Sequence, residues 1–137
     1  VKAIIGRTTI PISNFPSMIR GSMPSDGGHL IMSEEEKTSL IEKHPEVSSI
    51  IKGYMGAEDF LNSYNRYCLW MNENDYKIYG NIPSIKERTE GVRQMRLSSN
   101  TPSTQEYANY PYLFRQPQYI ESESIIVPST SSDTLTF

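Results

Sequence analysis

The sequence has little of several features that define common protein classes. It contains a single cysteine, so no disulfide can form within the chain, and a reducing cytoplasmic environment is expected. It holds no apolar run of the length that a membrane-spanning helix needs, and its first residues lack the pattern of a signal peptide. Hydrophobic residues make up 36% of the chain. We therefore expect one loop-rich α+β domain with a modest core.

The chain also has fewer basic than acidic residues, 13 Lys and Arg against 16 Asp and Glu. The net charge of −3 weighs against a simple nucleic-acid binder, although the charges are unevenly distributed. Residues 76–99 carry +3 and residues 1–32 carry +2, whereas residues 33–63 carry −4 and residues 100–137 carry −3. This pattern is compatible with a small DNA-facing edge and equally with ordinary scatter, so charge alone does not decide the function.

The motifs of methyl transfer are missing. Methylation of an amino group on DNA needs an Asn/Asp-Pro-Pro-aromatic loop, and the Asn-x-Pro segments at 14–16, 81–83 and 109–111 lack its double proline. Gly27-Gly28 does not have the glycine spacing of a dinucleotide-binding loop and precedes a strand. We therefore expect no catalytic residue and no cofactor-binding residue within this chain.

Metal chemistry is equally weakly supported. His29, His44 and Cys68 are too few and too scattered for a zinc site, and Cys68 is expected to be a small buried hydrophobe. A nuclease-type set could be sought in Asp26 with residues 35–37, but those glutamates fall in the first turn of a capped helix, where acids favour the helix dipole. We expect no metal ligands.

The most informative stretch runs from Gly21 to Met71. Pro24, Asp26 and the two glycines that follow it form a turn-prone sequence, which should direct a strand at 29–32. Ser33 then predicts a helix N-cap, with Glu36 completing a capping box for a helix over 34–44.

The remaining elements follow from apolar spacing and turn residues. We predict a second short helix ending at Gly53, a helical turn over 56–61, a strand over 65–71 and a polar turn over 72–75. The longest helix should cover 83–98, followed by a helical turn over 104–109. Short strands are predicted at 2–5, 112–114, 124–127 and from 135, and residues 1–20 read as a linker.

The helix over 83–98 is the best candidate for contact with nucleic acid. Ile85, Val92 and Met95 fall on one side of it, with arginines flanking that side and further basic residues beyond them. Its arginines and lysine could neutralise phosphates. The alternative is an ordinary solvated face, balanced in part by Glu87 and Glu90.

A series of motifs resembles one family. It comprises Gly21-x-Met23-Pro24-x-Asp26-Gly27-Gly28-His29-Leu30-Ile31, Ser33-x-x-Glu36, Gly56-x-Glu58-x-Phe60-Leu61-Asn62 and Arg66-Tyr67-Cys68-Leu69-Trp70, and later Ile82-Pro83-x-Ile85-x-x-Arg88, Val92-Arg93-x-x-Arg96, Arg115-Gln116-Pro117 and Ile126-Val127-Pro128. In order and spacing they are similar to the target recognition domain of MmeI-like DNA adenine methyltransferases, the type IIG/IIL restriction–modification enzymes.

The resemblance implies a division of labour. Residues 1–20 would lead in from an upstream catalytic domain that uses S-adenosylmethionine, and residues 21–137 would be a recognition domain that continues beyond Phe137. Its partners would be double-stranded DNA and the catalytic domain of the same polypeptide, with no membrane involved. The candidate DNA-binding residues are Arg66, Arg88, Arg93, Arg96 and Asn100. The alternative is a non-catalytic interdomain scaffold that never touches DNA.

Overall fold

The fold is a small α+β arrangement, as the sequence predicts. The computed structural model describes residues 19–118 and 125. Along this part of the chain lie β1 (Ile31–Ser33), α1 (Glu34–Lys43), the 3-10 helix η1 (Pro45–Ile50), β2 (Ile51–Tyr54), α2 (Ala57–Asn62), β3 (Arg66–Leu69), α3 (Glu73–Tyr79), α4 (Pro83–Leu97), α5 (Pro102–Glu106) and the 3-10 helix η2 (Tyr107–Asn109). Among the described residues, no helix has the length and apolar content needed to cross a lipid bilayer.

A three-stranded antiparallel sheet forms the centre of the molecule. β3 is its middle strand and pairs with β1 on one side and β2 on the other. Elements pack on both faces of this sheet, so the neighbouring residues Cys68 and Leu69 are both buried although they point to opposite faces. Burial raises the pKa of the Cys68 thiol to about 11, so this residue is a protonated, apolar side chain at neutral pH, as expected.

The turn before β1 forms as its sequence predicts. Asp26 accepts hydrogen bonds from the backbone nitrogens of Gly28 and Leu30, at 3.0 and 2.6 Å. Gly27 and Gly28 have φ angles of +66° and +88°, which glycine adopts without the steric cost that a side chain would add. The turn therefore feeds the chain directly into β1, which begins two residues later than predicted.

The capping box of α1 is also confirmed. Ser33 Oγ accepts from the nitrogen of Glu36 at 3.2 Å, and the Glu36 carboxylate accepts from the nitrogen of Ser33 at 2.8 Å. The bond from the Ser33 backbone, helped by Arg88, lowers the pKa of Glu36.

Replacing Ser33 with alanine should lower the free energy of unfolding by about 1 kcal/mol, because α1 loses one side-chain cap and leaves a backbone N–H unsatisfied. Thermal or urea unfolding followed by circular dichroism measures this. Ser39→Ala, a similar change further along α1, serves as the control and should leave the midpoint nearly unchanged. Equal losses from both variants would contradict a specific capping role.

Three predicted elements are wrong. The helix expected to end at Gly53 stops at Ile50, and residues 51–54 form β2, because pairing with β3 outweighs the local helical spacing. The polar turn over 72–75 is the start of α3, where Asn72 and Asp75 cap each other's backbone nitrogens. Residues 112–114 are not a strand, since within the described residues they have no pairing partner.

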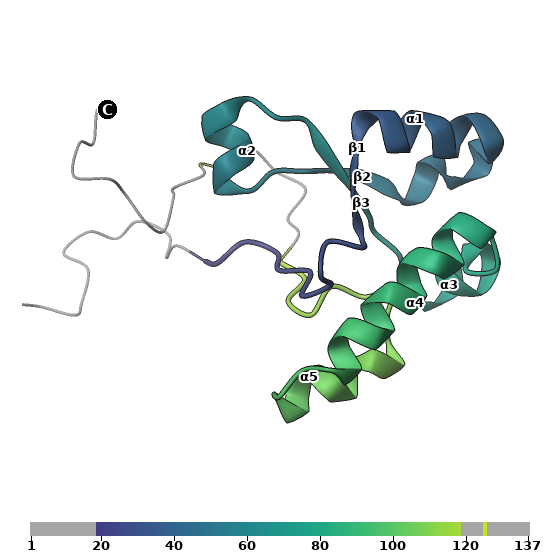
Figure 1. Cartoon of the computed structure of the whole chain (residues 1–137). Helices are drawn as coiled ribbons and strands as arrows, with labels where there is room; N and C mark the ends of the chain where they lie inside the picture. The colour runs from purple at the N-terminus through teal and green to yellow at the C-terminus, as the bar shows by residue number, and fades with distance from the viewer. Residues whose placement is uncertain (1–18, 119–124, 126–137) are drawn as a thin grey trace, which may run out of the picture.

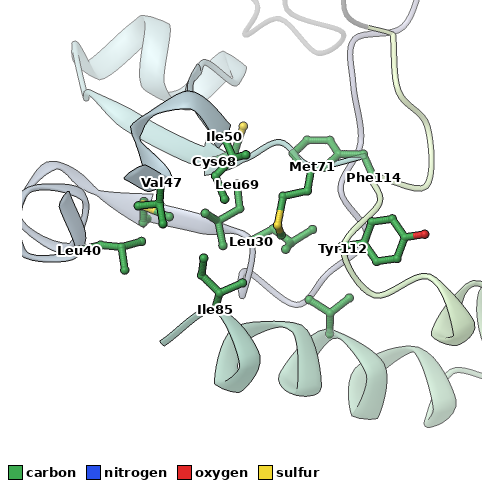
Figure 2. Close-up of a cluster of buried hydrophobic side chains, with 12 residues drawn as sticks. Leu30, Leu40, Val47, Ile50, Cys68, Leu69, Met71, Ile85, Tyr112 and Phe114 are labelled. Atoms are coloured by element: carbon green, nitrogen blue, oxygen red, sulfur yellow. The ribbon is translucent and has the colours of Figure 1, made fainter. Parts of the chain in front are cut away.

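The hydrophobic core joins the sheet to α1 and α4. Figure 2 shows the cluster, with Leu30 and Leu69 at its centre and Ile85 rising from α4 to meet them. Aromatic pairs extend this core toward the chain segment after η2. Tyr112 stacks on Tyr76 with ring centroids 4.5 Å apart, and Phe114 meets Trp70 edge-on at 4.9 Å. The segment over 112–114 is thus held by packing, without strand pairing. The strands predicted at 2–5, 124–127 and from 135 lie outside the described residues, apart from Ile125.

Candidate nucleic-acid interface

The structure does not bring the five candidate DNA-binding residues together on one surface. One lies on β3, three lie on α4 but point in different directions, and the last follows α4 in the next turn. Their partners divide them into two groups, although Arg66 and Arg93 are equally exposed at 41% and 42%. Arg66, Arg88 and Arg96 bind to other elements of the domain, whereas Arg93 pairs with Glu90 of its own helix and Asn100 is exposed.

Arg96 lies in the interior, with none of its surface exposed. Its guanidinium donates five hydrogen bonds of 2.6 to 3.0 Å, all to backbone carbonyl oxygens. These oxygens belong to Pro24, Ser25, Tyr107, Tyr110 and Leu113. Burial lowers the pKa of Arg96, although the group stays a cation because arginine starts so high. This arginine ties α4 to the glycine-rich turn and to the segment after α5, and its N–H donors face away from solvent.

Arg88 connects α4 to the strand and helix beside it. Its Nη1 donates to the carbonyl oxygens of His29 and Ile31, both at 3.0 Å, and its Nη2 donates to Glu36 at 2.7 Å. The side chain is 20% exposed. On the same side of α4, the ring of His29 lies against Gly91, where an added Cβ would come within 2.6 Å of the imidazole.

Arg66 forms a bidentate ion pair with Asp59 of α2. Nε and Nη2 of the arginine donate to the two carboxylate oxygens at 2.5 and 2.7 Å, and Asp59 is only 1% exposed. Asp59 also accepts from the backbone nitrogen of Gly56. The hydrogen bonds from Arg66 lower the pKa of Asp59, and Asp59 in turn raises the pKa of Arg66. Sequence reasoning missed Asp59, whose position three residues after Gly56 is the signal for a helix N3 acid.

Arg93 and Lys86 form the exposed basic stripe of α4. They are seven residues apart, close to two helical turns, so their side chains leave the helix on one side. The Arg93 side chain is 42% exposed, although its Nε atom is buried without a hydrogen-bond partner, 3.6 Å from Glu90. Glu90 also accepts from Gln94 at 2.8 Å. Asn100 is exposed in the turn that follows the helix. These three side chains can turn toward a phosphate without breaking the fold.

Two shallow grooves lie elsewhere on the surface. One is lined by residues of α1 and the start of α4, and its Arg88 is already paired with Glu36. The other lies beside α2, between the ends of β2 and β3, and its walls include three tyrosines with Arg66. Within residues 19–118 and 125, no group of three or more His, Cys, Asp or Glu is placed to hold a metal ion. The glycine pair is committed to the turn into β1, so its residues do not fit a cofactor loop.

Comparison with known proteins places this fold. The family described as "MmeI, target recognition domain" matches residues 1–137. DNA methyltransferase A of Bacillus subtilis (strain 168) is 37% identical over 130 residues, which are 95% of this chain and 15% of that relative. A solved structure of the type IIL restriction–modification enzyme MmeI in complex with DNA matches with a TM-score of 0.75 and 29% identity, covering 89% of this chain and 16% of that one. The chain thus spans less than a fifth of the length of either relative. Its resemblance to this family is confirmed, and the chain belongs to the MmeI target recognition domain family.

Proposed function

We propose that this chain is the DNA target-recognition module of a site-specific DNA adenine methyltransferase of a bacterial restriction–modification system. The observation that carries the proposal is the match of the whole chain to a target recognition domain family, joined to the structural likeness to an enzyme solved with DNA. The Bacillus subtilis relative is named a DNA methyltransferase, which supports placing the module in an enzyme of that kind. The module would act in the cytoplasm, where its duplex substrate lies.

Bond-making belongs to another part of the polypeptide in this proposal. The chain corresponds to about 15% of the methyltransferase relative, which leaves most of that protein's length for a catalytic domain. S-adenosylmethionine would bind there and supply the methyl group. The target adenine must leave the base stack before it reacts, at a cost of roughly a few kcal/mol. A recognition module helps to offset that cost by gripping the DNA backbone and reading base edges around the site.

Within this chain, we assign the grip on DNA to the basic stripe of α4 and the turn after it. Of the candidates that the sequence suggests, Arg93 is partly exposed and Asn100 is exposed, and Lys86 lies on the same side of α4 as Arg93. Arg66, Arg88 and Arg96 instead hold the elements of the domain in place, because their guanidinium groups are hydrogen-bonded to Asp59, to Glu36 and to backbone oxygens. Phosphate contact is the role that fits the stripe, since a mobile exposed cation positions DNA without reading its sequence.

Removing both charges of the stripe, in a Lys86→Ala, Arg93→Ala variant, should weaken duplex binding roughly tenfold at about 0.1 M salt. The slope of log affinity against log salt should become shallower by about 2, because two fewer counterions are released. Fluorescence anisotropy across a salt series, on the longer methyltransferase polypeptide, measures both quantities.

A Lys52→Ala, Lys77→Ala variant is the matched control, because it removes the same charge from exposed positions on β2 and α3. Its salt slope should equal that of the unchanged protein. An equal loss in the two variants would show that only overall charge matters, and no change in the stripe variant would contradict contact through α4.

The second candidate function is an interdomain scaffold that never touches DNA. It is favoured by the net charge of −3 and by the internal pairing of three of the four candidate arginines. Crosslinking the complete polypeptide to its DNA separates the two readings. Crosslinks from residues 83–100 support recognition, and their absence, with DNA bound elsewhere, supports the scaffold.

A further inference from the structure

An apolar surface on and around α2 stands apart from the basic stripe. Met55, Phe60, Leu61 and Tyr64 are 54%, 54%, 69% and 61% exposed, so four large apolar side chains reach solvent within ten residues. The other exposed large apolar side chains among the described residues are spread over the rest of the domain. Apolar side chains gathered in this way mark contact surfaces far more often than isolated ones do. We call Met55, Phe60, Leu61 and Tyr64 the α2 surface.

The backbone beneath the α2 surface is held firmly. Asp59 is buried under it and is bonded to Arg66 and to the nitrogen of Gly56, which fixes the helix to β3. Ser63 ends the helix in a left-handed conformation, with φ of +55°, and the nitrogen of Tyr64 donates to the carbonyl of Asp59 at 3.0 Å. A surface whose frame is set in advance loses less conformational freedom when a partner binds.

The charge around the α2 surface argues for a protein partner over DNA. Residues 53–65 contain Glu58 and Asp59 and no lysine or arginine. Asp59 is neutralised by Arg66, which leaves exposed Glu58 as the remaining charge within this segment, while exposed Lys52 precedes it. The segment itself offers a phosphate backbone no cation, and Arg66, which lies in the groove beside Met55 and Tyr64, is already paired with Asp59. An apolar protein surface with a basic residue opposite Glu58 would complement it.

The position of α2 separates this surface from the α4 stripe. In Figure 1, α2 lies at the end of the sheet opposite α1 and well away from α4 and α5. DNA held along α4 would therefore leave α2 free to meet another surface. The two relatives are more than six times as long as the matched segment, so a tethered neighbour is available at high effective concentration.

We propose that the α2 surface docks the module against another domain of the same methyltransferase polypeptide. That domain would present an apolar patch with a basic residue opposite Glu58. This inference rests on the proposed function, because it takes the chain to work within such a polypeptide. The docking would fix the direction in which the α4 stripe faces the DNA. Interfaces of this kind between domains of one chain bury on the order of 600–1,500 Å².

Site-specific photo-crosslinking in the complete polypeptide tests the proposal. A photoreactive phenylalanine in place of Leu61 should give crosslinks, mapped by mass spectrometry, to residues of the same polypeptide outside 1–137. The matched control carries the same group in place of Ile78, which is 67% exposed on α3 and lies outside the α2 surface. That position should not crosslink to the segment that Leu61 reaches.

Every other outcome overturns the proposal: crosslinks from Leu61 to DNA, to a second copy of the polypeptide, or to nothing outside this domain. A Phe60→Ser, Leu61→Ser variant adds an independent readout, because both side chains are more than half exposed and lie outside the buried core cluster. Hydrogen exchange of the α2 amides should become faster in that variant if the interface is lost, and an unchanged rate counts against docking.

Duplex binding is measured in the same preparations. Salt-dependent binding without the Leu61 crosslink defeats only this inference, whereas loss of specific DNA binding by the unmodified polypeptide defeats the proposed function.

Discussion

Replacing Arg96 with methionine should lower the free energy of unfolding by about 3–5 kcal/mol, a large share of the 5–15 kcal/mol typical of whole domains. Methionine keeps much of the apolar stem but offers no donor. The five carbonyl oxygens that Arg96 now satisfies would lose their partner, and an unsatisfied buried polar group costs about 1–3 kcal/mol. The loss should fall most heavily on the turn at Pro24 and on the segment from Tyr107 to Leu113.

Urea denaturation followed by tryptophan fluorescence and circular dichroism measures the effect. Arg93→Met is the matched control, because it makes the same chemical change on the same helix at a side chain that is 42% exposed. It should move the stability by less than about 0.5 kcal/mol. Arg96→Lys should recover part of the loss, since lysine keeps the charge but its ammonium carries three donors and no planar fork. Similar stability of the Met variants at 93 and 96 would refute the structural role of Arg96.

Replacing Asp59 with asparagine should cost about 2–3 kcal/mol at neutral pH, because hydrogen bonds to a charged group are worth about 1.5–3 kcal/mol and the amide cannot accept both N–H groups of Arg66. The cost is kept below that of a fully buried pair because Arg66 is 41% exposed and stays partly hydrated. The damage should appear first in α2, whose N-terminal turn Asp59 also caps.

The same pair gives stability a defined dependence on pH. Arg66 holds the pKa of Asp59 below its usual range, so the folded state binds this proton less readily than the unfolded chain does. The contribution of the Asp59–Arg66 pair to the free energy of unfolding is therefore complete above the ordinary aspartate pKa of about 3.9. It is lost as pH falls through the lower pKa of Asp59 in the folded state. In Asp59→Asn this part of the acid transition should disappear.

Asp75→Asn provides the matched control for both measurements. Asp75 also occupies the third position of a capped helix and accepts from the backbone of Asn72, but no arginine among the described residues forms an ion pair with it. Its loss should cost about 0.5–1 kcal/mol, the value of a cap alone. Equal effects at 59 and 75, in stability or in the acid transition, would show that the Arg66 pair adds nothing to the cap.

Both large predictions concern arginines that the sequence alone placed on the DNA side of the domain. The family match supports the proposed recognition function, and we propose that its DNA contacts lie at Lys86, Arg93 and Asn100, which are not bonded to other elements of the described domain. A variant that damages DNA binding through Arg96 or Arg66 should therefore also unfold part of the domain. A variant at Lys86 or Arg93 should damage DNA binding while stability is retained. This contrast distinguishes residues that stabilise the domain from residues that contact DNA.

The sequence by itself determined the features that depend on near neighbours along the chain. The turn at Asp26, the capping box of Ser33 with Glu36 and the helix that begins at Pro83 are each set by contacts within about four residues, so short patterns reveal them. The order of family motifs likewise pointed to the target recognition domain. The start of α3 could also have been predicted from the spacing of Asn72 and Asp75, which is that of a capping box, but the same polar residues also fit a turn.

Only the tertiary structure decided which arginine faces solvent. Arg93 and Arg96 are identical residues three positions apart on one helix, yet the partners of Arg96 lie 11 to 72 residues away in the sequence. The same holds for Arg88, whose contacts lie 52 to 59 residues away, and for β2, which exists because β3 pairs with it. Helical spacing indicates the direction of a side chain. It does not show whether that direction meets carbonyl oxygens or water, because chain folding supplies those groups from distant segments.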